Sequence, residues 1–178
     1  MKKLSFLLLL IALFNLSCSN NSSQGDAKEV SMSKEAFLKK IKDQEKKVFS
    51  QSPEKLNDLK LKELADQYVE YALYGDSLAP EFLYKAAGIY MNTGKPKKAI
   101  SSLNKIINHY PDFNKLENCY FLKAFVYDDK LKDYSNAGKF YKEYLNKYPK
   151  GVFADDAKLL IKNLGKSTEE IFKEIKKE

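Results

Sequence analysis

Apolar residues recur at helical spacing over most of this chain, and no strand-like alternation of apolar and polar residues persists anywhere. One pair of apolar stripes occupies residues 83–90 and 99–106, and a similar pair occupies residues 120–127 and 137–144. Two apolar stripes joined by a short polar turn are typical of two antiparallel helices packed on each other. We therefore predict an all-α protein built from helix pairs.

Proline and glycine mark the ends of these predicted helices. Pro80 opens the first pair, Gly94-Lys95-Pro96 forms its turn, and Pro111 follows its second helix. The second pair closes in the same way at Pro149, but it holds one more residue between its two small positions than the first pair does. We place this extra residue in the turn at 130–134, because a loop insertion costs little.

The order of residues in both pairs resembles the tetratricopeptide repeat, a unit of about 34 residues. Each copy has a large residue, a small residue or pair, Tyr, then Ala, an apolar residue and a closing Pro. The copies cover about residues 80–112 and 117–150, and the wider resemblance covers about 60–165. It implies a right-handed superhelix of antiparallel helix pairs, an α-solenoid that binds a partner protein. Small residues let the paired helices approach closely, namely Ala87 with Ala99 and Ala124 with Ala137.

Partial units flank the two clear repeats within a helical domain that we predict at 33–178. A helix should start after Ser33, and Ser52 could cap another that begins at Pro53 and extends to Tyr74. Residues 65–72 match a second helix, but Pro53 falls where its first helix needs a small residue. The first helix of a third unit should follow Gly151. The capping box Ser167-x-x-Glu170 should start a final helix at 167–177. We expect this helix to cap the end of the stack.

The N-terminus carries the features of a lipoprotein signal peptide at residues 1–17. Lys2 and Lys3 precede an apolar run at 4–16, which is too short to span a bilayer as a helix. Leu16-Ser17-Cys18 resembles a bacterial lipobox, which implies lipidation of Cys18 with fatty acyl chains such as palmitate. An ordinary signal peptide with a coincidental cysteine, or an uncleaved anchor, is the alternative. Residues 18–32 are predicted to be a flexible tether. Ser19 resembles the non-acidic residue that goes with outer-membrane sorting in many Gram-negative lipoproteins, and we expect the protein on the periplasmic side of that membrane.

The net charge of +7 does not point to nucleic acid. Every basic residue is lysine, whereas phosphate and guanine recognition favours the planar fork of arginine. A solvated lysine-rich surface explains the charge and also tolerates anionic lipid headgroups.

Candidate chemistry is sparse, so we predict no catalytic residue, no cofactor and no metal site. The aspartates near 128–133 lack the glycine and glutamate of a calcium loop, and Asp155-Asp156 diverge on one helix. His109 is the only histidine and should lie at a helix end, where a cation suits the helix dipole. Cys119 lies in an apolar stretch and is most simply a small buried residue.

The family resemblance implies a partner-binding groove lined mainly by the first helix of each repeat. The positions that usually point inward correspond to ten residues: Glu81, Tyr84, Gly88, Met91, Asn118, Phe121, Phe125, Asp128, Ala154 and Lys158. The alternative for Phe121 and Phe125 is that they pack between helices. One subfamily uses a lysine–asparagine clamp for chaperone C-termini, but Tyr84 and Gly88 occupy those positions here and disfavour that specificity.

Together these features predict a lipid-anchored envelope scaffold that binds a partner protein. The plan is similar to the repeat lipoprotein of the outer-membrane β-barrel assembly machine and to the repeat-bearing Tol–Pal coordinator. The function would then lie in outer-membrane assembly or envelope maintenance. Two alternatives are a homo-oligomeric structural envelope protein and a non-catalytic subunit of a polysaccharide or peptidoglycan enzyme.

Overall fold

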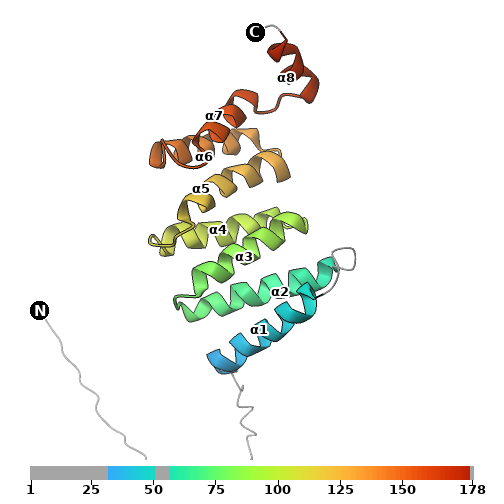
Figure 1. Ribbon diagram of the computed structural model, residues 1–178, viewed down its shortest axis with the longest axis vertical. Helices are drawn as coiled ribbons and strands as arrows, with labels where there is room; N and C mark the ends of the chain where they lie inside the picture. The colour runs from blue at the N-terminus through green and yellow to red at the C-terminus, as the bar shows by residue number, and fades with distance from the viewer. Residues whose placement is uncertain (1–31, 51–56, 177–178) are drawn as a thin grey trace, which may run out of the picture. The chain divides into compact units, whose positions relative to one another are not determined.

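The computed structural model describes residues 32–50 and 57–176, and the predicted signal peptide and nearly all of the tether lie outside these ranges. Over the described residues the protein is all-α, as predicted (Figure 1). A 3₁₀ turn, η2 (Ala72–Tyr74), follows α2, and a π-helical segment, η3 (Val126–Lys130), follows α5. The α-helices are α1 (Lys34–Phe49), α2 (Asp58–Tyr71), α3 (Ala79–Asn92), α4 (Pro96–His109), α5 (Leu116–Phe125), α6 (Tyr134–Lys147), α7 (Ala154–Asn163) and α8 (Thr168–Ile175).

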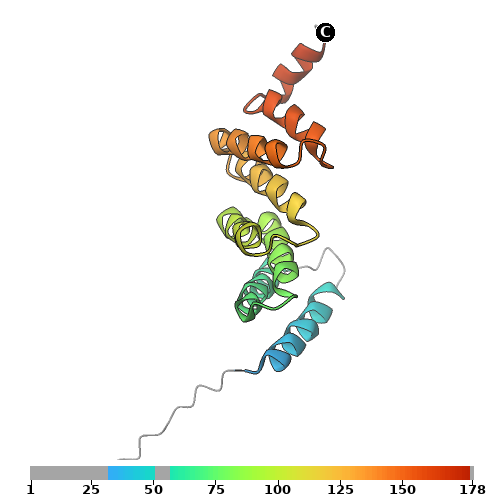
Figure 2. The same ribbon diagram turned by 90° about the vertical axis from the view of Figure 1, so that its left-hand side faces the viewer.

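From α1 to α7 each helix packs against the next one along the chain. Figure 2 shows the result as two layers, with the odd-numbered helices α1, α3, α5 and α7 on one side and α2, α4 and α6 on the other. Among the described residues no helix combines the length and apolar character that crossing a membrane requires. In the two clear repeats the predicted first helices are α3 and α5, which both lie in the odd-numbered layer.

The alanine seams lie where the sequence predicts them. Ala87, Ala99, Ala124 and Ala137 are all essentially inaccessible to solvent. Leu103 and Ile106 are fully buried beside the first seam, where each contributes about 1.5–3 kcal/mol. The positions of these side chains confirm the predicted register of both helix pairs.

The N-terminal pair differs from the prediction in the identity of its first helix. Ser33 caps α1 as expected, accepting from the Ala36 amide at 3.2 Å. It is α1 that packs on α2, so residues 34–49 supply the first helix and not the segment that begins at Pro53. Helix α2 begins at Asp58, with Asn57 accepting from the Leu59 amide at 2.8 Å. Ser52 and Pro53 lie outside the described residues.

The extra residue of the second repeat lies in the helix end and not in the turn. In the first repeat the Lys95 amide donates to the Tyr90 carbonyl, five residues back, at 2.9 Å. In the second repeat the Asp133 amide donates to the Tyr127 carbonyl, six residues back, at 2.8 Å. The wider turns of η3 absorb the insertion before the chain reverses. The prediction that placed it within 130–134 was wrong.

The C-terminal helices begin as predicted, but the last one does not cover the stack. Gly165 has a φ of 75° and separates α7 from α8. The capping box is present, with Ser167 and Glu170 each bonded to the other's backbone amide. However, α8 is not among the closely packed helix pairs of the described chain, and Phe172 on it is 59% exposed. Figure 1 shows α8 as a short helix beyond α7.

Candidate partner-binding groove

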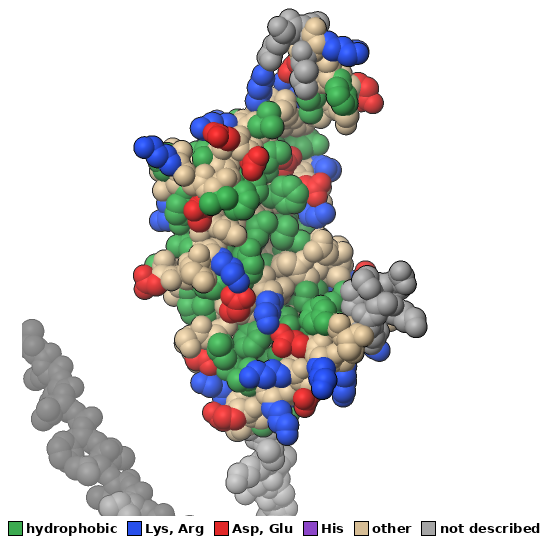
Figure 3. Space-filling view, viewed as in Figure 1, with side chains coloured by type: hydrophobic (Ala, Val, Ile, Leu, Met, Phe, Trp, Pro, Cys, Tyr) green, Lys and Arg blue, Asp and Glu red, His purple; other side chains and the backbone are tan. Residues whose placement is uncertain are grey.

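Hydrophobic side chains gather on the face formed by the odd-numbered helices. Figure 3 views this face and shows them in its middle over α5, while over α3 and α1 lysines and carboxylates lie among the hydrophobic side chains. A folded monomer usually keeps a contiguous apolar surface small unless something binds there. This face is therefore the first place to look for a binding site.

The apolar hollow on this face lies between α1 and α3, with α2 as its floor. Its volume is about 750 Å³, within the range of sites that hold a side chain or a small ligand. Leu61 and Tyr68 of α2 and Ile89 of α3 form an apolar base, while Phe49 of α1 is a half-exposed wall. We call this hollow the α1–α3 groove.

Gly88 opens the α3 side of the groove. A Cβ atom built at Gly88 would meet no atom within 4 Å, so the space beside the helix backbone is empty. Glycine inside a helix costs roughly 0.5–1 kcal/mol relative to alanine, yet here no neighbouring atom requires it. The groove therefore has room for a partner side chain at this position.

A three-helix hydrogen-bonded cluster fixes the edge of the groove. The Glu45 carboxylate of α1 accepts from the Tyr68 hydroxyl of α2 at 2.6 Å and from the Lys85 ammonium of α3 at 2.8 Å. Burial raises the pKa of Glu45, but the hydrogen bonds from Lys85 and Tyr68 outweigh it, so the pKa lies below its usual value. The carboxylate stays charged at neutral pH and holds α1 and α3 at a set separation.

A second cluster repeats this arrangement one helix further along. Asp66 of α2 accepts from the Tyr90 hydroxyl of α3 and from Lys98 of α4 at 2.6 Å. In both clusters a carboxylate on one helix binds a buried tyrosine on the next helix and a lysine on the helix after that. The cluster at Asp66 lies outside the groove and has a structural role in aligning successive helices.

Between α3 and α5 the predicted groove residues bind the chain that enters α5. Glu81 accepts two hydrogen bonds from Lys115, at 2.8 and 2.9 Å, and the Lys115 ammonium lies 5.1 Å from the centre of the Tyr84 ring. Asn118 faces the Tyr84 hydroxyl at 3.5 Å. Glu81, Tyr84 and Asn118 therefore form one half-exposed polar patch between α3 and α5.

Two of the ten predicted groove residues lie in the core. Phe121 is buried and stacks on the Phe153 ring at 4.5 Å, which is the alternative that its helical spacing left open. Ala154 is buried at the start of α7. Neither side chain is available to a partner, because neighbouring helices cover both of them.

The other predicted residues are spread along the chain. Met91 and Phe125 are half-buried against the core, and Asp128 accepts from the Tyr141 hydroxyl at 3.3 Å. Lys158 is exposed and pairs with Asp155 at 2.9 Å. Of the ten, only Gly88 lines the α1–α3 groove.

Sequence reasoning missed Phe49, Leu61, Tyr68 and Ile89, which make the groove apolar. Phe49 and Leu61 lie outside the two clear repeats, where the repeat pattern gives no inward positions. The signal that could have located them is the apolar stripe of α1, had it been paired with α2.

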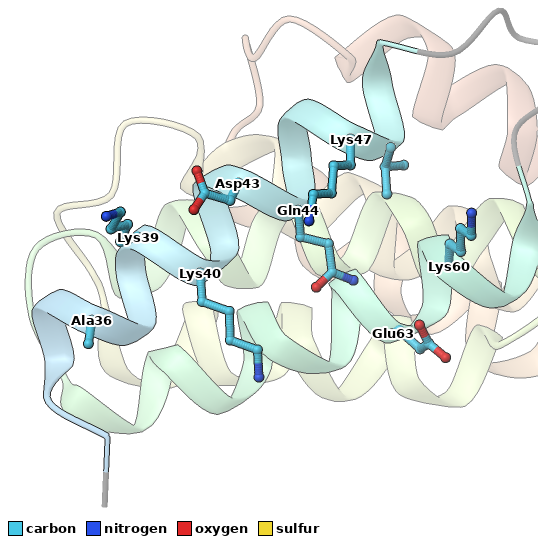
Figure 4. A pocket seen from close by; sticks show the side chains of 9 residues that line it. Ala36, Lys39, Lys40, Asp43, Gln44, Lys47, Lys60 and Glu63 are labelled. Carbon is cyan, nitrogen blue, oxygen red and sulfur yellow. The ribbon is translucent and has the colours of Figure 1, made fainter.

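A second hollow lies against a different face of α1, between α1 and α2, with a volume of about 610 Å³. Figure 4 shows lysines on both helices around it, together with the carboxylates of Asp43 and Glu63. A lining of mixed sign gives no strong preference for an anion or a cation. The apolar α1–α3 groove remains the better candidate for a partner.

Two of the aspartates considered for a calcium site have structural partners. Asp133 caps α6 by accepting from the Asn136 amide at 3.1 Å, and Asp129 pairs with Lys130 at 2.8 Å. Burial raises the pKa of the Cys119 thiol to about 12, so it is not a nucleophile at neutral pH. Within the described ranges, no three His, Cys, Asp or Glu side chains form a group that could hold a metal ion.

Comparison with known proteins agrees with the geometry of the central helices. The family model for the tetratricopeptide repeat matches residues 81–112 and 118–151. These two units are tetratricopeptide repeats. The repeat is a protein-interaction module and is typically non-catalytic. Neither the curated proteins nor the solved structures gave a match to the chain.

Proposed function

We propose that this protein is a lipid-anchored scaffold of the cell envelope that holds a partner protein in the α1–α3 groove. The observation that carries the proposal is an apolar hollow beside the first tetratricopeptide repeat, held open by a charged three-helix cluster. Such a site binds a protein segment without needing catalytic groups. The lipobox-like Leu16-Ser17-Cys18 supports a lipid anchor, and Ser19 favours the outer membrane, where we place the protein on the periplasmic side.

The lining of the groove favours an apolar anchor residue on the partner. A large aliphatic or aromatic side chain would lie beside Gly88 and contact Leu61 and Ile89. Buried apolar anchors of this kind contribute most of the affinity in many interfaces. The exposed Asn92 and the Glu45–Lys85 pair are polar groups at the rim that can fix orientation. Such a partner would serve outer-membrane assembly or envelope maintenance.

Crosslinking from matched positions tests the groove directly. A photoreactive residue replaces either Asn92, which lines the groove, or Asn108, which is also exposed and lies on α4 in the other layer. We expect Asn92 to give a specific adduct in cells, which mass spectrometry identifies, and Asn108 to give none. The same adduct from both positions would contradict the proposal. An adduct between two copies of the chain would favour the homo-oligomeric alternative, which light scattering of the purified protein would then confirm.

The chain's two cysteines allow a matched test of the anchor. Cys18→Ser should abolish fatty-acid labelling and release the protein from membranes. Cys119→Ser alters only the buried thiol and should leave both unchanged. Membrane fractionation that is the same for the wild type and for Cys18→Ser would refute the anchor.

A further inference from the structure

Exposed apolar side chains cluster where the described chain begins. Leu73 is 78% exposed in η2, and Tyr74 and Leu78 are exposed beside it. Met32, also exposed, joins them because the Tyr74 hydroxyl donates to its carbonyl oxygen at 3.2 Å. We call these four residues the apolar turn.

The apolar turn is held in place by polar groups and not by burial of its own side chains. Asp76 accepts from the Tyr71 hydroxyl at 2.7 Å and from the Leu78 amide at 2.9 Å, and it pairs with Lys34 at 3.0 Å. Since Leu73 and Leu78 remain largely exposed, local stability does not explain why these positions are leucine. The Lys34–Asp76 pair partly neutralises the charges beside the turn, where Glu35 also lies.

The position of the predicted lipid anchor indicates what covers this turn. Only residues 19–31 separate Cys18 from Met32, a distance of at most about 50 Å and on average about 20 Å for an unstructured chain. A lipidated Cys18 would therefore keep the apolar turn next to the bilayer. Tethering of this kind raises the local concentration so much that even weak affinity gives steady contact.

We propose that the apolar turn rests in the headgroup–acyl boundary of the membrane that holds Cys18, an inference that rests on the anchor proposed above. Leucine side chains favour this boundary by their apolar area, and a tyrosine favours it because its ring is amphipathic. Contact here would hold the end of the domain at α1 and η2 against the membrane.

Tryptophan fluorescence can test this contact because the chain has no tryptophan. The lipidated full-length protein carries Leu73→Trp, or Leu159→Trp as a control on α7, where the native leucine is 58% exposed. Each variant is reconstituted into phosphatidylethanolamine–phosphatidylglycerol vesicles with and without brominated acyl chains. A side chain that lies about 5–10 Å into the boundary is within reach of the bromines, so we expect about twofold quenching at position 73 and none at position 159.

Flotation of the same vesicles separates the failure of the anchor from the failure of the inference. Protein that floats but shows no more quenching by brominated chains at position 73 than at position 159 would overturn membrane contact while leaving the anchor intact. Protein that does not float would overturn the anchor and the inference together. An emission shift at position 73 that grows with protein concentration without vesicles would assign the turn to a second copy and would also overturn membrane contact.

Discussion

The two tetratricopeptide repeats share their alanine seams but fill the space beside them differently. In the first repeat the large residues after Ala99 are Leu103 and Ile106. In the second repeat the residues at the same spacing after Ala137 are Tyr141 and Tyr144. Each tyrosine hydroxyl donates to a carboxylate, to Asp128 at 3.3 Å and to Glu117 at 2.7 Å. Beside the seam on the second helix, the first repeat therefore has apolar packing alone, whereas the second repeat also makes hydrogen bonds from two buried tyrosines.

The comparison shows that the repeat geometry requires a small residue at the seam more strictly than it requires apolar neighbours. A tyrosine can replace a leucine or isoleucine beside the seam if its hydroxyl finds an acceptor. The second repeat supplies these acceptors from α5 and η3, the elements that hold Glu117 and Asp128. Its stability should therefore respond more to the loss of single polar atoms.

The largest effect should follow from a charge placed in either seam. We expect Ala99→Glu and Ala137→Glu each to destabilise the fold by about 4 kcal/mol or to prevent folding, because a buried carboxylate has no partner there and the helices must separate. Thermal denaturation followed by circular dichroism measures this. Ser101→Glu, on the exposed face of α4, is the control and should melt close to the wild type. A wild-type melting temperature for both seam variants would refute the register.

A smaller effect should follow from removing one hydroxyl in the second repeat. Tyr144 donates to Glu117 and accepts from the Phe153 amide at 2.9 Å. Tyr144→Phe therefore removes one hydrogen bond from the Glu117 carboxylate and one from the Phe153 amide. The expected loss is about 1–3 kcal/mol in denaturant unfolding. Ile106→Val, at the matching position of the first repeat, should cost about 0.5–1.5 kcal/mol. If Tyr144→Phe proves neutral, the second core does not depend on its hydrogen bonds as we infer.

Substitutions at corresponding turn residues of the two repeats should change the stability of the protein in opposite directions. Gly94 has a φ of 69°, and the corresponding residue in the second repeat, Lys132, has a φ of 52°. A side chain is strained in this region, so Lys132→Gly should stabilise the protein by up to about 1 kcal/mol and Gly94→Ala should destabilise it by a similar amount. The free energies of unfolding of the two variants and of the wild type are compared by equilibrium denaturant unfolding. Shifts of the same sign would contradict the equivalence of these residues.

The smallest effect concerns acid sensitivity, and it differs between Asp66 and Asp128. Burial raises the pKa of Asp66, but hydrogen bonds from Lys98 and Tyr90 bring it below its ordinary value of 3.8. The ionised form of Asp66 therefore stabilises the fold above about pH 4, and this stabilisation is lost as the pH falls. Burial raises the pKa of Asp128, so its ionised form costs stability at neutral pH, and this cost disappears in acid.

Melting temperatures measured from pH 7 to pH 3 should separate the two carboxylates. Asp66→Asn should lower stability at pH 7 and reduce its loss in acid. Asp128→Asn keeps an acceptor for Tyr141 and should raise stability slightly at pH 7. The opposite order of these two variants would contradict the assigned pKa directions.

The sequence predicts the helix pairs well because a small residue at a helix crossing and a proline after a helix are local requirements. It does not predict the π-helical segment, since the pattern shows only that a residue is inserted between Ala124 and Ala137. It also does not separate groove from core, because Phe121 and Tyr84 have the same helical spacing. The packing of Phe153, Tyr141 and Tyr144 around the Phe121 ring is what buries this side chain.

The repeat pattern could not predict the pairing of α1 with α2, for a different reason. The link between these helices, residues 50–57, is longer than the turns of the two repeats, so the spacing rule fails there. As a result the walls and floor that α1 and α2 give to the groove could not be located from the motif. Of the predicted groove residues, Gly88 lies inside a complete repeat and lines this hollow.

The central claim is that the α1–α3 groove holds the partner, and the most direct test is to fill it. No atom lies within 4 Å of a Cβ at Gly88, so Gly88→Ala and Gly88→Trp should both fold, with only the indole occupying the groove. Affinity for the partner captured at Asn92 is then measured for both variants. The account predicts wild-type affinity for Gly88→Ala and a loss of at least about tenfold for Gly88→Trp, because a central anchor pocket is blocked. Equal affinities for the two folded variants would contradict it.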